Sequence, residues 1–143
     1  MKMPQLILPI RNVLNNLSRN HATKTTTQNL INYPKVKLLS NGKILYLLIS
    51  IYMHGETLFS RTIVHGARAK KHIYVYDNVR DELESLGLCS RALGGGIMDF
   101  DPQARTMTIQ GKCETFGRAD HTVTKQILLG TPKYKDYKIT VGR

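Results

Sequence analysis

Apolar side chains recur every three or four positions from Ile73 to Leu86, with charged residues in the gaps. This spacing predicts a helix packed along one side, with an apolar stripe made of Ile73, Tyr76, Val79, Leu83 and Leu86. His72 falls on the same stripe, one turn before Tyr76. No Ser, Thr, Asp or Asn stands just ahead of His72 to cap the first turn. The free N–H groups of this helix opening therefore suit an anion, above all a phosphate.

Further apolar runs and turn signals predict strands around this helix. The long run at 43–53 predicts a strand that is buried on both faces at its centre. The dipeptide Asn41-Gly42 favours a hairpin turn, so residues 36–39 are expected to form a short strand before it. Residues 54–60 are expected to form a loop. Three more strands are expected, at residues 61–67, 105–111 and 137–141.

A second helix is predicted over residues 120–130, because Asp120 is a good cap residue and Gly130 is a common helix end. The loop before it covers residues 112–120. Five or six strands, two helices, no repeat and mostly hairpin connections predict an α+β fold, with helices laid on a sheet. A length of 143 residues suits one domain, which we place at residues 34–143.

Residues 1–33 form a basic N-terminal extension without any Asp or Glu. Apolar residues between positions 6 and 17 are compatible with an amphipathic helix that also carries Arg11. A segment with arginines, many hydroxyls and no acids is typical of a mitochondrial presequence, but a disordered basic tail fits equally well. We therefore expect a cytoplasmic protein, with mitochondrial targeting by the extension as the alternative.

The formal net charge of +11 is mostly a property of the first part of the chain. Residues 1–55 hold seven Lys or Arg and no acid, whereas the rest holds fourteen basic and ten acidic residues. No basic cluster interleaves with aromatic residues, so we expect no nucleic-acid partner. No apolar run approaches the ~18 residues that span a bilayer, so we expect no membrane partner. Cys89 and Cys113 lie far apart without metal-ligand spacing, which predicts two reduced thiols and no metal site.

Four sequence blocks together resemble the phosphohistidine phosphatase and Janus family. In chain order they are KHIYVYDNV at the helix start, LGGG, the loop G-x-x-x-x-F-G-x-A-D-H-x-x-T, and YKDYKITV at the end. The blocks keep suitable distances over roughly residues 34–143, so the resemblance covers nearly the whole predicted domain. The segments YPKVKLL and IVHGA look most like a fly branch of the family that is named for sex-regulated, male-germline expression.

The resemblance implies a six-stranded mixed sheet flanked by two helices, within the α+β class. It also implies a protein histidine phosphatase, a hydrolase that works without a metal or another cofactor. The implied substrate is a partner protein that bears phosphohistidine, and by extension phospholysine. The family likeness further implies a monomer with a role in sex differentiation or in the male germline.

The family's catalytic histidine falls on His72, which would accept a proton from the attacking water. The family's phosphate loop falls on Cys113, Glu114 and Thr115, where backbone N–H groups and a hydroxyl would hold the phosphoryl oxygens. Glycines 94–96 would let another segment approach closely, or would form a bulged strand, and both interpretations remain open. His121, at the start of the second predicted helix, is expected to have a structural role.

Three positions depart from the family's pattern. Leu45 stands where the family has a phosphate-side lysine, Ile97 where an arginine is usual, and Cys113 where a hydroxyl residue opens the loop. Charge-assisted contacts to phosphate contribute ~1.5–3 kcal/mol each, so two lost cations would cost decades in rate or affinity. Three nearby cations are candidates to compensate: Lys43, Lys112 and Arg118. The sequence thus leaves open an active phosphatase and a weakened member that binds phosphoproteins or regulates a partner.

Cys113 also invites comparison with cysteine phosphatases, which wrap a phosphate between a cysteine and an arginine that have five residues between them. Only four residues separate Cys113 from Arg118. We therefore expect Cys113 to be a quiet, partly buried thiol rather than a nucleophile.

Overall fold

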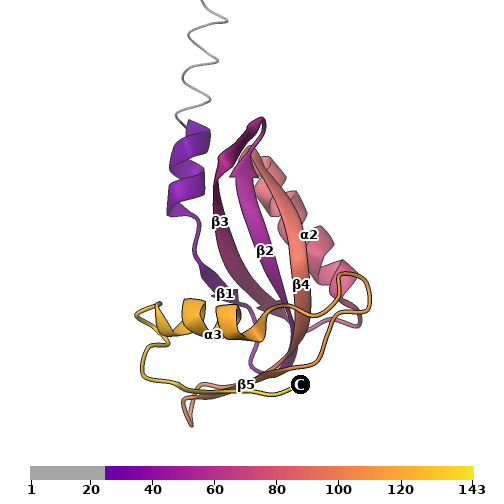
Figure 1. The fold of residues 1–143 in the computed structure, drawn as a ribbon, viewed down its shortest axis with the longest axis vertical. Helices are drawn as coiled ribbons and strands as arrows, with labels where there is room; N and C mark the ends of the chain where they lie inside the picture. Colours follow the sequence, from indigo (N-terminus) through magenta and orange to yellow (C-terminus); the bar gives the residue numbers. More distant parts are fainter. Residues whose placement is uncertain (1–24) are drawn as a thin grey trace, which may run out of the picture.

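Six strands form one mixed sheet in the order β1-β3-β2-β4-β5-β6 (Figure 1). The computed structural model describes residues 25–143, apart from the side chains at positions 57 and 58. The inner pairs run antiparallel, whereas β1 pairs with β3 and β5 pairs with β6 in parallel. The predicted α+β class and six-stranded mixed sheet are therefore confirmed. The strands are β1 Val36–Leu38, β2 Gly42–Met53, β3 Glu56–Ala67, β4 Leu88–Asp101, β5 Thr106–Gln110 and β6 Lys138–Val141.

Two helices flank the sheet on opposite faces, and a shorter helical segment covers residues 25–32. Helix α2 (His72–Ser85) packs on one face and helix α3 (His121–Leu129) on the other. Helix α3 begins and ends where predicted: the Asp120 carboxylate accepts hydrogen bonds from backbone N–H groups of the first turn, and Gly130 is the C-cap residue. None of the helices within residues 25–143 combines the length and the hydrophobicity needed to cross a membrane.

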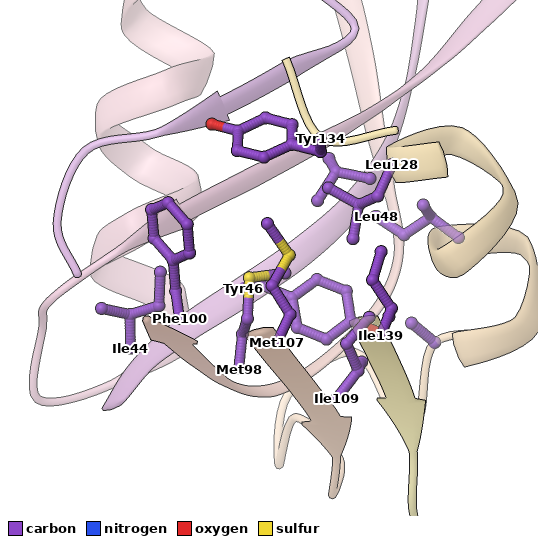
Figure 2. Packing of buried hydrophobic residues seen from close by; sticks show 12 residues of the cluster. Ile44, Tyr46, Leu48, Met98, Phe100, Met107, Ile109, Leu128, Tyr134 and Ile139 are labelled. Carbon is purple, nitrogen blue, oxygen red and sulfur yellow. The ribbon is translucent and has the colours of Figure 1, made fainter. Parts of the chain in front are cut away.

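Alternating side chains of β2 supply both cores, as expected for a strand that is buried on two faces. On the α3 face, Ile44, Tyr46 and Leu48 pack with residues from β4, β5, β6 and α3 (Figure 2). On the α2 face, Leu47, Ile49 and Ile51 contact the buried side of α2. Each helix is therefore fixed against the central strand, and so is the residue at which each helix begins.

The buried stripe of α2 runs through His72, Val75, Val79 and Leu83. The predicted stripe shared Val79 and Leu83 but placed Tyr76 where the structure has Val75, and Tyr76 is only half-buried. Spacings of three and four fit both sets of residues, so periodicity alone does not choose between them. Because Val75 rather than Tyr76 is buried, His72 lies in the middle of the buried side of the helix.

The predicted hairpin at Asn41-Gly42 is wrong, because β1 pairs in parallel with β3 rather than with β2. Gly42 instead begins β2 with φ 76°. The predicted loop at 54–60 is also wrong, since only residues 54 and 55 form a turn and strand β3 starts at Glu56. The backbone pairing of β3 with β2 therefore continues through a stretch whose composition looked like a loop.

Residues 25–33 pack against the sheet, although the sequence pattern placed them in the N-terminal extension. The side chains of Leu30 and Tyr33 are buried in the core of the α2 face. Arg61 of β3 donates from Nη1 to the carbonyl oxygens of Leu30 and Tyr33, at 2.5 and 2.7 Å. The packed unit therefore starts before the predicted boundary at residue 34. The amphipathic helix expected between positions 6 and 17 lies outside the described residues.

Candidate functional site

His72 is the first residue of α2, and no side chain caps the helix opening in front of it. The N-cap residue Lys71 has extended backbone angles, φ −143° and ψ 150°, and makes no side-chain cap hydrogen bond. This confirms the uncapped helix start that was predicted from the sequence. The first turn therefore keeps the partial positive charge that attracts anions.

One nitrogen of the His72 ring is hydrogen-bonded to the backbone, and the other has no hydrogen-bond partner within the described residues. Its Nε2 lies 2.8 Å from the carbonyl oxygen of Gly96 in β4, and only 2% of the side chain is exposed. A carbonyl oxygen can only accept a hydrogen bond, so Nε2 carries the proton and donates it. Nδ1 is buried and has no hydrogen-bond partner within the described residues. In the neutral ring, Nδ1 therefore carries a free lone pair, as a general base requires.

The loop after β5 is closed on itself and docked onto β4. The N–H of Cys113 donates to the Gly117 oxygen at 3.1 Å, and the N–H of Gly117 donates back to the Cys113 oxygen at 2.8 Å. The Gly117 oxygen also accepts from the N–H of Gly95 at 3.0 Å, and Ala119 donates to the Gly95 oxygen at 3.0 Å. These bonds fix the turn of Cys113, Glu114 and Thr115 beside β4, the strand whose Gly96 carbonyl accepts the hydrogen bond of His72.

The triple glycine of β4 permits this docking. A Cβ atom at Gly94 would lie 2.7 Å from the backbone nitrogen of Ala119, too close for any larger residue without a shift. A Cβ atom at Gly95 would lie 3.1 Å from the Cβ atom of Cys113. The pairing of β2 with β4 is also irregular at this point, between Leu48 and Ile49. Both interpretations of the glycines are therefore present, the close approach of another segment and the bulged strand.

Glu114 is the loop residue whose side chain faces His72. Its Oε1 lies 3.7 Å from Nδ1 of His72, and 63% of the Glu114 side chain is exposed. A hydrogen bond from its own backbone N–H lowers the pKa of the Glu114 carboxyl, and Lys71 and the protonated form of His72 lower it further. Thr115 is exposed at the tip of the turn. The structure thus brings Glu114 to the unpartnered nitrogen of His72, a contact that the sequence did not predict.

Cys113 points into the protein rather than toward a ligand. It is 1% exposed, and its Sγ accepts a hydrogen bond from the N–H of Phe116 at 3.2 Å. Both Cys113 and Cys89 are free thiols, as predicted. The thiol therefore shapes the turn from within, and it is more deeply buried than expected.

Leu45 and Ile97 form an apolar pair where the resembled family has two cations. They are direct neighbours across β2 and β4, and both are half-buried. Leu45 packs against the core of the α2 face, the face that also holds His72. Lys43 lies two residues away on β2, opposite Asp99, and is exposed. Lys112 and Arg118, at the two ends of the loop, are exposed and form no ion pair within the described residues.

His121 begins α3 on the opposite face of the sheet, and a chain of hydrogen bonds holds it. Its Nε2 lies 2.8 Å from the carbonyl oxygen of Gly111, so Nε2 donates and Nδ1 accepts from the hydroxyl of Tyr46. The hydroxyl of Thr124 donates to Tyr46 at 3.2 Å. Burial raises the pKa of Tyr46 to about 12. The network anchors Gly111, two residues before Cys113, which agrees with a structural role for His121.

A second buried histidine, His65, was not singled out from the sequence. It lies on β3 beside Lys37 of β1 and is 3% exposed. Burial, with a smaller contribution from Lys37, lowers its pKa to about 4. Glu82 of α2 acts electrostatically on His65 and accepts hydrogen bonds from the Tyr33 hydroxyl at 2.6 Å and from Lys37 Nζ at 2.7 Å. A polar residue inside the apolar segment IVHGA was the only sequence signal for this site.

A pocket away from His72 lies on the α3 side of the sheet and is lined by Ser50, Tyr52, Ser60 and Arg91. Its volume is about 210 Å³. The lining offers one cation and three hydroxyls but no group with a free basic nitrogen, so it is not the candidate for hydrolysis. Within residues 25–143, no three His, Cys, Asp or Glu side chains gather as they would around a metal ion.

Comparison with known proteins gives a consistent picture. Residues 30–138 match the Janus/Ocnus family. The chain is 50% identical to the sex-regulated protein janus-B of Drosophila pseudoobscura pseudoobscura over 116 residues, which cover 80% of this chain and 81% of the relative. It is 38% identical to janus-B of Drosophila sechellia over 141 residues, 99% of each chain. Janus-B of Drosophila melanogaster is 43% identical over 112 residues, 78% of this chain and 79% of the relative.

Proposed function

The chain belongs to the Janus/Ocnus family, and from this membership and the surroundings of His72 we propose that it is a protein histidine phosphatase. Its substrate would be a phosphohistidine on the surface of a partner protein. Several relatives are named sex-regulated protein janus-B, and we extend this to the present chain as a sex-regulated protein of the male germline. Its proposed site of action is the cytoplasm, and the proposed acting form is the monomer.

The observation that carries the proposal is that one nitrogen of His72 is hydrogen-bonded and the other has no partner within the described residues. Nε2 donates to the Gly96 carbonyl, so the proton is held on that side of the ring. Nδ1 is left with a lone pair that no described residue occupies. A buried imidazole with one nitrogen fixed and the other free is oriented to take a proton from a water molecule.

In the proposed reaction a water oxygen attacks phosphorus while Nδ1 of His72 takes one of its protons. The new P–O bond forms as the P–N bond to the substrate imidazole breaks. The proton on Nδ1 then passes to the departing imidazole nitrogen, so the products are inorganic phosphate and unmodified histidine. In the turn of Cys113, Glu114 and Thr115, the N–H of Cys113 is already bonded to the Gly117 oxygen, so the phosphoryl oxygens would be received by the backbone N–H groups of Glu114 and Thr115 and by the Thr115 hydroxyl. The proposal requires neither a metal nor another cofactor, because the P–N bond is labile.

A second function, a phosphoprotein-binding or regulatory module, is favoured by one specific observation. Leu45 and Ile97 make an apolar pair on the face of the sheet that holds His72. Two formal charges of the resembled enzymes are thus missing, and Lys43 beside them is exposed and faces Asp99 across the strands. Such a site would still attract a phosphoryl group weakly but would hydrolyse phosphohistidine slowly.

The test follows hydrolysis of a phosphohistidine-bearing protein by wild type, His72→Gln and His54→Gln. A glutamine at 72 retains a donor for the Gly96 carbonyl but has no basic nitrogen, so we expect a loss of roughly 10²–10⁴-fold. The same substitution at His54, an exposed turn residue, should leave the rate unchanged. Full activity of His72→Gln would remove His72 from the mechanism.

A restored variant separates the two functions. Leu45→Lys/Ile97→Arg/Cys113→Ser returns the charges and the hydroxyl that the resemblance implies. An inactive wild type with an active restored variant would establish the binding or regulatory module. Measurable wild-type hydrolysis that depends on His72 would establish the phosphatase.

A further inference from the structure

Glu114 lies with its carboxylate beside His72, at the position where an incoming phosphoryl group would bind. Its carboxylate lies 3.7 Å from the unpartnered Nδ1, at the uncapped start of α2. Its own backbone N–H, one of the loop donors proposed above for a phosphoryl oxygen, lowers the pKa of this carboxyl. A charged oxygen of the protein therefore already lies at the uncapped helix start that makes this site attractive to anions.

We propose that the Glu114 carboxylate is a resident anion of this site, which a phosphoryl group must displace before it can bind. Glu114 would then determine how strongly the site takes dianionic ligands. The inference rests on the proposed function only for the identity of that ligand.

The electrostatic surroundings support this competition. The pKa of Glu114 is lowered first by its backbone N–H and further by Lys71, so the side chain stays charged at neutral pH. The apolar pair Leu45 and Ile97 supplies no further cation that could hold a second anion beside the first. A dianion that enters while the carboxylate remains in place would be repelled at short range.

The loop allows the carboxylate to leave without unfolding. Its ends are tied by the two hydrogen bonds between Cys113 and Gly117 and by the bonds to Gly95. The Glu114 side chain itself is 63% exposed, so rotation about its own bonds is enough to move it into solvent. Displacement would therefore change a side-chain rotamer and leave the backbone N–H groups in position.

The experiment titrates inorganic phosphate into the full chain and follows the His72 ring by NMR. Wild type is compared with Glu114→Gln, Glu114→Ala and Glu84→Gln. Glutamine keeps the size and an acceptor oxygen but removes the charge, and alanine removes the side chain. Glu84 is an exposed residue in the last turn of α2, so its substitution changes net charge equally, far from the helix start.

We expect phosphate to bind about five- to tenfold more tightly to both Glu114 variants, and to bind Glu84→Gln as it binds wild type. Equal or weaker binding by the Glu114 variants would overturn the inference, as would the same gain in Glu84→Gln. So would the absence of a His72 response in all four proteins.

The outcome is independent of hydrolysis. Tighter phosphate binding in an inactive chain would support the resident anion and remove the phosphatase. His72-dependent hydrolysis with unchanged phosphate affinity in Glu114→Gln would do the reverse.

Discussion

Lowering the pH should destabilise this protein chiefly through the buried ring of His65. The pKa of His65 falls from an ordinary 6.5 to about 4, because the ring is buried and faces Lys37. A histidine with a depressed folded-state pKa contributes stability that is complete above about pH 6.5. That stability is lost as the pH falls toward 4, because the unfolded chain binds the proton first.

The size of the effect follows from these two values. At pH 5 the unfolded ring is almost fully protonated, whereas the folded ring of His65 is protonated in about one molecule in ten. This difference lowers the free energy of unfolding by about 2 kcal/mol between pH 7 and pH 5. Hydrogen bonds from Lys37 and Tyr33 lower the pKa of Glu82, so this carboxylate, which interacts electrostatically with His65, stays charged over the same range.

The assay is urea unfolding at pH 7 and at pH 5 for wild type, His65→Gln and His54→Gln. His65→Gln cannot titrate at this position, so its stability should fall by about 2 kcal/mol less than that of wild type over the same interval. His54 is an exposed turn residue, and its substitution should leave the pH dependence of wild type intact. Parallel losses in wild type and His65→Gln would refute the reasoning, since they would place the titrating groups elsewhere.

Two further substitutions test how the loop and α3 are held. Gly94→Ala would bring a methyl group to 2.7 Å from the backbone of Ala119, so we expect a loss of roughly 1–3 kcal/mol in urea unfolding. Unchanged stability would mean that the loop yields without cost. Asp120→Ala removes the side chain that accepts from the first turn of α3, and should cost about 1 kcal/mol in the same assay. An Asp120→Asn variant should retain most of that stability, and an equal loss in both would contradict the capping role.

Elements with local signals were predictable from the sequence. The bounds of α3 follow from Asp120 and Gly130, which act on the backbone within one turn of themselves. The uncapped opening at His72 is equally local. By contrast, the partner of β1 depends on where β3 returns in space, so the turn signal at Asn41-Gly42 misled the prediction. The packing of residues 25–32 depends on Arg61 and α2 in the same way.

The candidate site was predictable only in part. Its residue types came from the resemblance to a family, because no spacing along the chain joins His72 to a loop some forty residues later. The orientation of the ring depends on the path of β4, which brings the Gly96 carbonyl to Nε2. The position of Glu114 depends on the docking of its loop onto Gly95. Neither contact leaves a periodic or compositional trace.

The hydrogen bond between His72 and the Gly96 carbonyl also limits which ring nitrogen can take part in proton transfer. With Nε2 committed to a backbone acceptor inside the sheet, only Nδ1 can exchange a proton with solvent or a ligand. A proton accepted at Nδ1 must therefore be released from Nδ1, on the same side of the imidazole. Any chemistry that needs a relay, entering at one nitrogen and leaving at the other, is beyond the reach of this residue.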